Sequence, residues 1–199
     1  MMSDFQPVVI EGVHVRLEPL SLGHVDELAE VGLDPELWKY TTTDIRTAVD
    51  MKRYVEIALE LLQQGNAIPY AIHAKGAGKA VGSTRYANID RTHRRLEVGW
   101  TWIAKPWQRT TVNTESKYLL LNQAFELLKC IRVEFKTDAL NLQSQNALVR
   151  IGATKEGVFR RHMLMPSGRH RDSVYFSMID SEWPGIKANL EKLLLASYR

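Results

Sequence analysis

The chain has 199 residues, of which 45% are hydrophobic, 25% charged and 9% aromatic. This composition excludes the disordered, collagen-like and fibrous classes, and a chain of this length can bury a sizeable core without disulfides or metal ions. The 26 lysine and arginine residues against 23 aspartate and glutamate residues give a net charge of +3. This mild excess suits anionic ligands without requiring a polyanion. We therefore expect a single domain over residues 1–199.

Residue types that commonly carry redox or metal chemistry are sparse. Cys130 is the single cysteine and stands between hydrophobic segments, so we interpret it as a small buried residue and not as a nucleophile. The six histidines form neither a His-x-x-x-His pair nor a His-Glu-x-x-His pattern, so we expect no metal. No run reaches the ~20 apolar residues of a membrane span, and no leader-like segment begins the chain. These observations predict a cytoplasmic protein with no membrane partner.

Hydrophobic periodicity and turn residues predict the order of helices and strands. In chain order we expect a strand over 13–17, helices over 23–31 and 47–65, strands over 68–74, 80–89 and 96–103, a helix over 113–128, a strand over 131–137, a helix over 144–151, strands over 157–164 and 171–178, and a helix from 184. One strand-helix-strand crossover among antiparallel neighbours predicts the α+β class, a mixed, mostly antiparallel sheet of about seven strands flanked by helices.

The strand over 96–103 alternates between two faces. One face is predicted to hold Leu96, Val98, Trp100 and Trp102, and the other to hold Glu97, Gly99, Thr101 and Ile103. Glu97 would then project away from the tryptophans. The alternative is an ordinary exposed strand residue that pairs with Arg94 or Arg95.

Four segments together resemble a known family. They are Glu97-Val-Gly-Trp-Thr-Trp102, Gln108-Arg-Thr-Thr-Val-Asn-Thr-Glu115, Asn141-Leu-Gln-Ser144 and Ile151-Gly-Ala-Thr-Lys-Glu-Gly157. The chain resembles the GNAT superfamily of N-acetyltransferases, in particular the branch with the ribosomal-protein N-terminal acetyltransferases of the RimJ and RimL type. The resemblance covers roughly residues 12–183. It implies an acyl-CoA N-acyltransferase fold, acetyl-CoA as co-substrate and an amine as acceptor.

The predicted helix N-terminus after Gln108 suits a pyrophosphate, because free N–H groups and the positive end of the helix dipole point outward there. The family has a small residue where this chain has Thr111 and Asn113, and the Thr111 side chain limits how closely phosphates approach. The alternative is that Asn113 or Thr114 merely caps a core helix. The resemblance implies that acetyl-CoA contacts the backbone near Trp102 and Ile103, and residues Gln108, Arg109, Thr110, Thr111, Val112, Asn113, Asn141 and Ser144.

The resemblance also implies the catalytic residues. Asn141 would hold the pantetheine arm, and the Ser144 hydroxyl would protonate or stabilise the departing thiolate, with Tyr175 as the reserve donor. The acidic character of Glu97 suits an amine substrate, from which it would take a proton directly or through water. The alternative for Asn141 and Ser144 is a plain helix cap. We expect direct attack by a primary amine, of α-amino type, on a peptide N-terminus or small molecule. The alternative function is a non-catalytic acetyl-CoA-binding or sensing module.

Four arginines surround the last predicted hairpin, namely Arg160, Arg161, Arg169 and Arg171. With a net charge of only +3 and no pattern of stacking aromatic residues, we interpret them as a solvated hairpin or as help for the coenzyme phosphates. We therefore expect no nucleic-acid partner. The expected oligomeric state is a monomer or a homodimer that uses the apolar terminal helix and the last hairpin.

Overall fold

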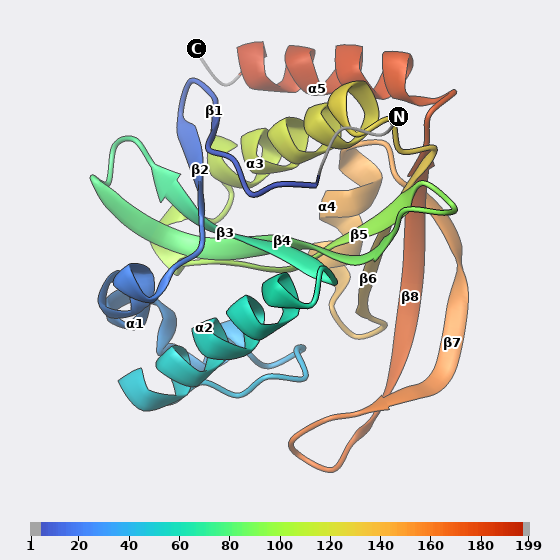
Figure 1. Ribbon diagram of the computed structural model, residues 1–199. Coiled ribbons are helices and arrows are strands. Elements are labelled where there is room, and N and C mark those ends of the chain that lie inside the picture. Colours follow the sequence, from blue (N-terminus) through green and yellow to red (C-terminus); the bar gives the residue numbers. More distant parts are fainter. Residues whose placement is uncertain (1–4, 197–199) are drawn as a thin grey trace.

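The computed structural model describes residues 5–196, which form a mixed sheet with helices on both faces (Figure 1). The strands are β1 (Ile10–Glu11), β2 (Val15–Pro19), β3 (Ala67–Ala74), β4 (Lys79–Asp90), β5 (Arg95–Ile103), β6 (Arg132–Asp138), β7 (Thr154–Leu164) and β8 (His170–Ile179). The helices are α1 (Val25–Gly32), α2 (Ala48–Gln63), α3 (Thr111–Asn122), α4 (Leu142–Arg150) and α5 (Trp183–Ala196). Short helical turns are η1 (Leu22–His24), η2 (Pro35–Leu37), η3 (Lys105–Trp107) and the π-helical η4 (Gln123–Leu127).

The sheet order is β1-β2-β3-β4-β5-β6-β8-β7, and only the β5–β6 pair is parallel among the described strands. The predicted α+β class with a mostly antiparallel sheet is confirmed. The sheet has eight strands instead of about seven because β1 is a two-residue strand, too short to show alternation. No helix within residues 5–196 is long and apolar enough to cross a membrane.

Two apolar layers hold the sheet between its helices (Figure 1). On one face, α1 and α2 bury residues such as Leu28, Met51 and Val55. On the other face, α3, α4 and α5 cover a larger core that includes Leu120 and Phe176. We name these the α1/α2 face and the α3 face.

The β5 and β6 strands pair over only three residues and then separate. Arg95 to Glu97 lie opposite Arg132 to Glu134, after which β5 continues beside β4 and β6 continues beside β8. A bulge in β5 accompanies the separation, since Trp100 has a φ of 49° and the β4–β5 register shifts there. An inserted residue bends a strand and increases its twist. The gap that opens between β5 and β6 is therefore built into the backbone.

The bulge also corrects the predicted faces of this strand. Leu96 and Val98 belong to the core of the α3 face as expected, but Trp102 packs in the cluster under α1 and α2, 5.3 Å from Trp38 between ring centroids. The alternation shifts by one residue at Trp100, whose ring lies near Lys136 on the face of Glu97. The prediction that Glu97 faces away from both tryptophans was therefore wrong, because a simple period of two does not continue through a bulge.

Gly82 of β4 allows β5 to approach at the end of the gap. A Cβ atom at Gly82 would lie 2.2 Å from the Trp102 carbonyl oxygen and 3.0 Å from the Ile103 Cα. Both neighbours are backbone atoms that cannot turn away, so any side chain here must displace the end of β5.

We predict that Gly82→Ala lowers the free energy of unfolding by about 2 to 4 kcal/mol, because the added methyl group overlaps fixed backbone. Urea denaturation measures this loss. Gly185→Ala is the matched control, because its Cβ meets nothing within 4 Å, and in a helix it should be neutral or stabilise by up to about 1 kcal/mol. A Gly82→Ala protein as stable as the wild type would contradict the proposed close approach.

Candidate active site

Two helix N-termini meet at the open end of the gap between β5 and β6. Gln108 donates an Nε2–H hydrogen bond of 2.8 Å to the Ile103 carbonyl oxygen at the end of β5. Its Oε1 accepts a 3.4 Å hydrogen bond from Gln143 in the first turn of α4, and α3 begins three residues after Gln108. The free amides of both helices therefore lie beside one another, where they can bind an anion.

The N-terminus of α3 differs from its predicted start. Thr110 is the N-cap, with its Oγ1 accepting a 3.3 Å hydrogen bond from the Val112 amide, and Thr111 is the first helical residue. Neither Asn113 nor Thr114 is the cap, so that alternative was wrong. The left-handed backbone turn lies at Arg109, with a φ of 61°, and not at Thr111. Thr111 therefore replaces the family's small residue without backbone strain, and its amide remains in the first turn.

The N-terminus of α4 is capped as the sequence alternative proposed. Asn141 is the N-cap, and its Oδ1 accepts a 3.0 Å hydrogen bond from the Ser144 amide. This leaves the Asn141 Nδ2 outside the cap. The Ser144 side chain is half-buried, and within the described part of the chain no hydrogen bond occupies its hydroxyl. Both residues thus retain polar atoms for a ligand.

Backbone alternation separates the two predicted residues at the end of β5. The Ala104 amide donates to the Val81 carbonyl of β4, so the preceding peptide groups, those of Ile103, point to the other side, toward the gap. Trp102 points its backbone groups back toward β4, and its ring is buried under α1 and α2. Of Trp102 and Ile103, only Ile103 therefore directs its backbone amide toward a ligand in the gap.

Glu97 lies buried on the α1/α2 face and is only 3% exposed. It accepts a 2.8 Å hydrogen bond from Asn88 Nδ2, and its Oε2 lies 3.5 Å from Lys136 Nζ. The alternative of an exposed residue paired with Arg94 or Arg95 was wrong, because both arginines have other partners. A buried, oriented carboxylate is a candidate proton acceptor.

Tyr175 of β8 shares a cavity with Glu97. The cavity, about 550 Å³ in volume, lies over β5, β6, β7 and β8 and is also lined by Glu134 and Glu156. Burial raises the pKa of Tyr175, and the Glu97 carboxylate raises it further, so the phenol keeps its proton at neutral pH. The predicted catalytic residues thus fall into two groups, Glu97 with Tyr175 on the α1/α2 face and Ser144 at the end of the gap.

Lys136 is a site residue that the sequence did not single out. It stands directly opposite Tyr175 in the β6–β8 register, and its Nζ lies 5.7 Å from the Trp100 ring centroid and 3.5 Å from Glu97. Val133 and Phe135 of β6 are buried on one face, so alternation places Lys136 on the other face. This alternation was the sequence feature from which Lys136 could have been identified. Its proximity to Glu97 depends on the parallel pairing of β5 with β6.

Lys117 of α3 is buried on the other face, behind the gap. Its Nζ donates a 2.7 Å hydrogen bond to Thr101 Oγ1 of β5 and lies 5.9 Å from the ring centroid of Phe135 on β6. In the described residues it forms no ion pair, and desolvation lowers its pKa to about 7. A lysine with a pKa near neutrality carries little charge above that pH.

We predict that Lys117→Met removes a pH dependence of stability. Between pH 7 and about 10.4, the unfolded chain binds a proton that the folded chain does not, so wild-type stability rises with pH by at most ~1.4 kcal/mol per unit. The stability advantage of Lys117→Met should therefore be largest near pH 7 and shrink as the pH rises. Urea denaturation of both proteins at several pH values measures it, and parallel pH profiles would contradict the lowered pKa.

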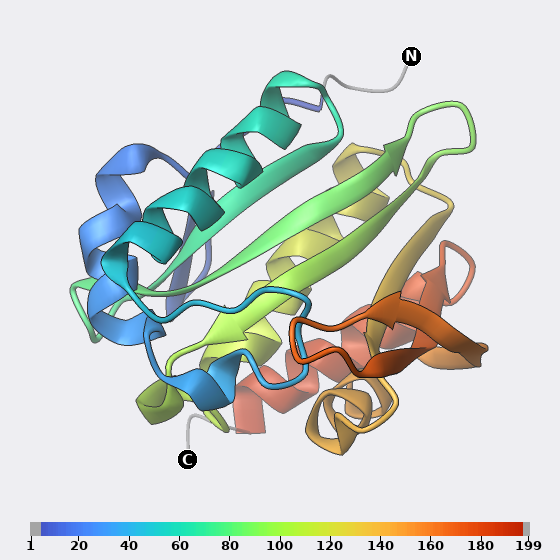
Figure 2. The same ribbon diagram turned by 90° about the horizontal axis from the view of Figure 1, so that it is seen from below.

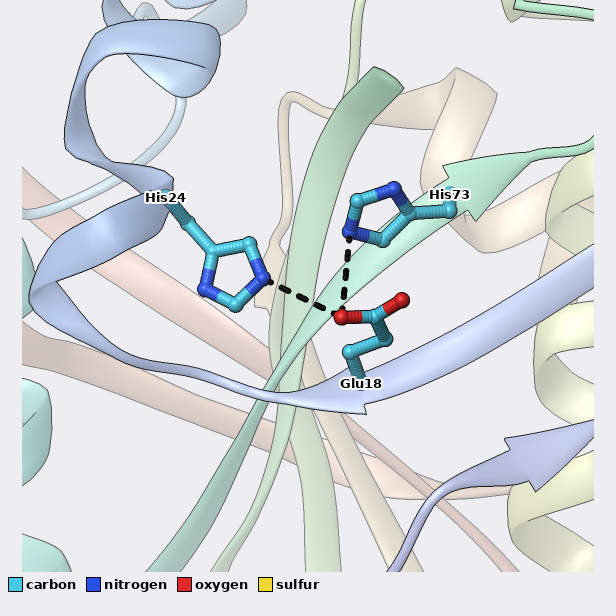
Figure 3. A group of neighbouring side chains, drawn as sticks. All are labelled: Glu18, His24 and His73. Carbon is cyan, nitrogen blue, oxygen red and sulfur yellow. Dashed lines mark ion pairs between the residues drawn. The ribbon is translucent and has the colours of Figure 1, made fainter. Parts of the chain in front are cut away.

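Glu18, His24 and His73 form a cluster that the sequence spacing did not reveal (Figure 3). The Nε2 atoms of His24 and His73 lie 3.5 Å and 3.9 Å from the Glu18 carboxylate, which Arg16 also contacts. The backbone amide of Ser21 donates to His24 Nδ1, so a neutral ring carries its proton on Nε2, which a metal would need free. Burial lowers the pKa of His73. His73 Nε2 has no hydrogen-bond partner among the described residues, so the cluster is held by electrostatic contacts with Glu18, and the absence of a metal stays a prediction.

Two other sequence interpretations can be compared with the structure. Cys130 is buried as expected, and desolvation raises the pKa of its thiol to about 11. The hairpin arginines are only partly solvated, because Arg169 pairs with the buried Asp138 and Arg171 is itself buried with a hydrogen bond to the Tyr40 carbonyl. The solvated-hairpin interpretation was wrong for Arg171.

Known proteins share this fold and parts of this sequence. The chain is 34% identical over 110 residues to the "Putative ribosomal N-acetyltransferase YdaF" of Bacillus subtilis (strain 168), a match that covers 55% of this chain and 59% of YdaF. The crystal structure of a putative acetyltransferase from T. thermophilus is 37% identical with a TM-score of 0.87, and the match covers 97% of this chain and all of that one. Mycobacterium smegmatis RimJ, in complex with CoA-disulfide, is 19% identical with a TM-score of 0.81 over 96% of this chain and 95% of RimJ, a likeness of fold.

A family model covers most of the site. The model described as "Acetyltransferase (GNAT) domain" matches residues 14–154, which include the β5–β6 gap and the N-termini of α3 and α4. The chain belongs to the GNAT acetyltransferase family.

Proposed function

We propose that this protein transfers an acetyl group from acetyl-CoA to a primary α-amine, on a peptide N-terminus or a small amino compound. The observation that carries the proposal is the separation of β5 from β6 after Glu97, with two helix N-termini beside its open end. This arrangement offers amides for an anion and an unpaired strand edge in one place.

The residues at the end of the gap fit the coenzyme. The first turn of α3, with the amides of Thr111 and Asn113, suits the pyrophosphate. Asn141 Nδ2 and the Ile103 amide suit the amide-rich pantetheine arm and the thioester oxygen. A RimJ structure with CoA-disulfide has the same fold, which supports this assignment.

The proposed reaction is direct. Acetyl-CoA supplies an activated acyl group, and the amine nitrogen attacks its carbonyl carbon, so that a C–N bond forms and the C–S bond breaks. Glu97 takes the proton that the amine loses, directly or through a water molecule. The Ser144 hydroxyl donates a hydrogen bond that stabilises the departing thiolate, which then takes its proton from water. Tyr175, which keeps its proton at neutral pH, is the reserve donor. Positioning supplies much of the rate.

The α-amine preference follows from protonation. An α-amine has a pKa near 7.7 to 8.0, so freeing its lone pair at pH 7 costs about 1 kcal/mol, whereas a lysine side chain costs about 4 to 5 kcal/mol. Glu97, the proposed proton acceptor, already contacts the amine of Lys136. We therefore expect the site to favour the acceptor amine that gives up its proton more easily. The name of the relative, "Putative ribosomal N-acetyltransferase YdaF", supports a ribosomal protein as one acceptor.

We predict that acetyl-CoA raises the melting temperature and that Thr111→Pro diminishes this shift. Proline is tolerated at the first helical position, and Thr110 already has the extended backbone that proline requires before it, so the variant loses one amide and little else. Loss of one hydrogen bond to a charged group weakens binding by about 10- to 100-fold. Thermal denaturation with and without acetyl-CoA measures the shift.

Thr111→Ala is the matched control, because it retains the amide and should retain the shift. An unchanged melting-temperature shift in Thr111→Pro would contradict the assignment of the coenzyme to this helix N-terminus.

We predict that the protein releases thiol from acetyl-CoA with peptides that have free N-termini, and that Ser144→Ala lowers this turnover by about 10- to 1,000-fold with little change in coenzyme affinity. The reason is that the proposed role of Ser144 arises only as the thiolate develops. A thiol-release assay measures turnover.

Peptides with blocked N-termini and Nα-blocked lysine are the control acceptors. Preference for blocked lysine would refute the α-amine assignment. Full activity in Ser144→Ala with a large loss in Tyr175→Phe would transfer the donor role to β8. Stabilisation by acetyl-CoA without thiol release from any amine would favour the alternative of a sensing module.

A further inference from the structure

Arg85 of β4 is a buried cation without an anionic partner in the described part of the chain. It is 2% exposed, and its Nε has no hydrogen-bond partner. Across residues 5–196 its guanidinium forms no ion pair or hydrogen bond, and its contacts are with the rings of Tyr54 and Trp100, each with a centroid 5.1 Å away. Burial of an unpaired charge opposes folding, so a residue of this kind points to a partner outside the chain.

The guanidinium lines an open cavity of about 180 Å³ on the α1/α2 face. Two carboxylates also line it, but neither contacts Arg85. Asp44 forms an ion pair with Arg46, and Asp50 accepts hydrogen bonds from Thr47 at the N-terminus of α2. The cavity therefore joins a desolvated cation to space that a ligand can enter.

This cavity lies near Glu97, the residue proposed to take the proton from the acceptor amine. Trp100, the bulged residue of β5, contacts Arg85, and its ring also lies 5.7 Å from Lys136, the partner of Glu97. The loop before α2 lies beside the β7–β8 hairpin on this face, where Arg171 donates to the Tyr40 carbonyl (Figure 2). The Trp100 ring therefore links Arg85 to the pair of Lys136 and Glu97.

Buried charges of both signs lie on this face among the described residues. Arg171, like Arg85, is buried and has an Nε atom without a partner. Lys136 is balanced by Glu97, and the buried Asp138 is bound by Arg169 from the hairpin. Arg171 interacts electrostatically with Asp138 and Glu97, whereas Arg85 has no anionic partner within residues 5–196. An acceptor that brings its own negative charge therefore fits best at Arg85.

We propose that Arg85 binds a carboxylate of the acceptor, so that the substrates are amines that also carry a carboxylate. This inference rests on the proposed function. A guanidinium presents two parallel N–H groups that match a carboxylate, and the two flanking rings hold its plane and exclude water. The carboxylate belongs either to an acidic side chain near a peptide N-terminus or to the α-carboxyl group of a free amino acid.

The test compares matched acceptors in the thiol-release assay with acetyl-CoA. One set consists of peptides that are identical except for Asp or Asn at the first, second or third position, and the other consists of free amino acids against their amides. Wild type should prefer the carboxylate form by about 10- to 100-fold in kcat/KM. Preference within the peptide set assigns a side-chain carboxylate, and preference within the amino-acid set assigns an α-carboxylate.

Arg85→Met should abolish the preference while it keeps or raises the melting temperature, because it removes an unpaired buried charge. Arg85→Lys should retain only part of the preference for the carboxylate form, since a lysine cannot bind both carboxylate oxygens in the same geometry. Arg16→Met, at an exposed ion pair with Glu18 on β2, lowers the net charge equally and should retain the preference. Equal use of both acceptor forms by wild type, or an undiminished preference in Arg85→Met, would overturn the proposal.

Calorimetric binding of the same acceptors in the presence of CoA separates this inference from the proposed function. Carboxylate-selective binding that is lost in Arg85→Met, without thiol release, would support the Arg85 site and refute acetyl transfer. Thiol release without selectivity would support acetyl transfer and refute the Arg85 site. Neither selective binding nor release would refute both.

Discussion

The separation of β5 from β6 after three residue pairs is the constraint on which the rest of the site depends. Strand pairing would otherwise satisfy the backbone groups of β5 as far as Ile103. The bulge at Trp100 bends β5, and Gly82 lets its end lie close to β4. An unpaired strand edge results, and α3 and α4 direct their N-termini to its open end. One irregular residue in one strand thus accompanies the gap that we propose as the site of the acyl donor.

The same bulge divides the chemistry between two faces. By shifting the alternation it moves Trp100 and Trp102 to the face of Glu97 and turns Thr101 toward the buried Lys117. Glu97, Tyr175 and the proposed carboxylate site therefore share the α1/α2 face, whereas Ser144 and the helix N-termini proposed to bind the coenzyme lie at the end of the gap. The charged groups Glu97, Lys136 and Arg85 lie in a desolvated setting, where electrostatic interactions are stronger than in water.

The sequence predicted much of the fold because most elements are long and regularly patterned. The order of the helices and strands and the single parallel crossover followed from periodicity and turn residues. The family motifs led to the helix N-termini. The two-residue β1 lies below the length at which alternation is visible, and the true start of α3 depends on the Thr110 cap, which competes with several other capping residues nearby.

The parts of the site that the sequence missed depend on contacts between distant residues. Lys136 meets Glu97 only through the register of β5 with β6, and Arg85 meets Trp100 only because the bulge turns that ring. The cluster of Glu18, His24 and His73 joins three elements with no common spacing. The alternation of residues 96–102 also gives no indication of the bulge. Trp100 and Trp102 have the same spacing as Leu96 and Val98, so the sequence places all four side chains on one face.

Residue-resolved amide hydrogen exchange, with and without acetyl-CoA, tests the central assignment of the gap as the coenzyme site most directly. The account predicts slower exchange at Ile103, Thr111 and Asn113, and unchanged exchange at His73 in the distant histidine cluster. Slowing confined to residues around the Glu97 and Tyr175 cavity, with none at Ile103 or the start of α3, would contradict the account.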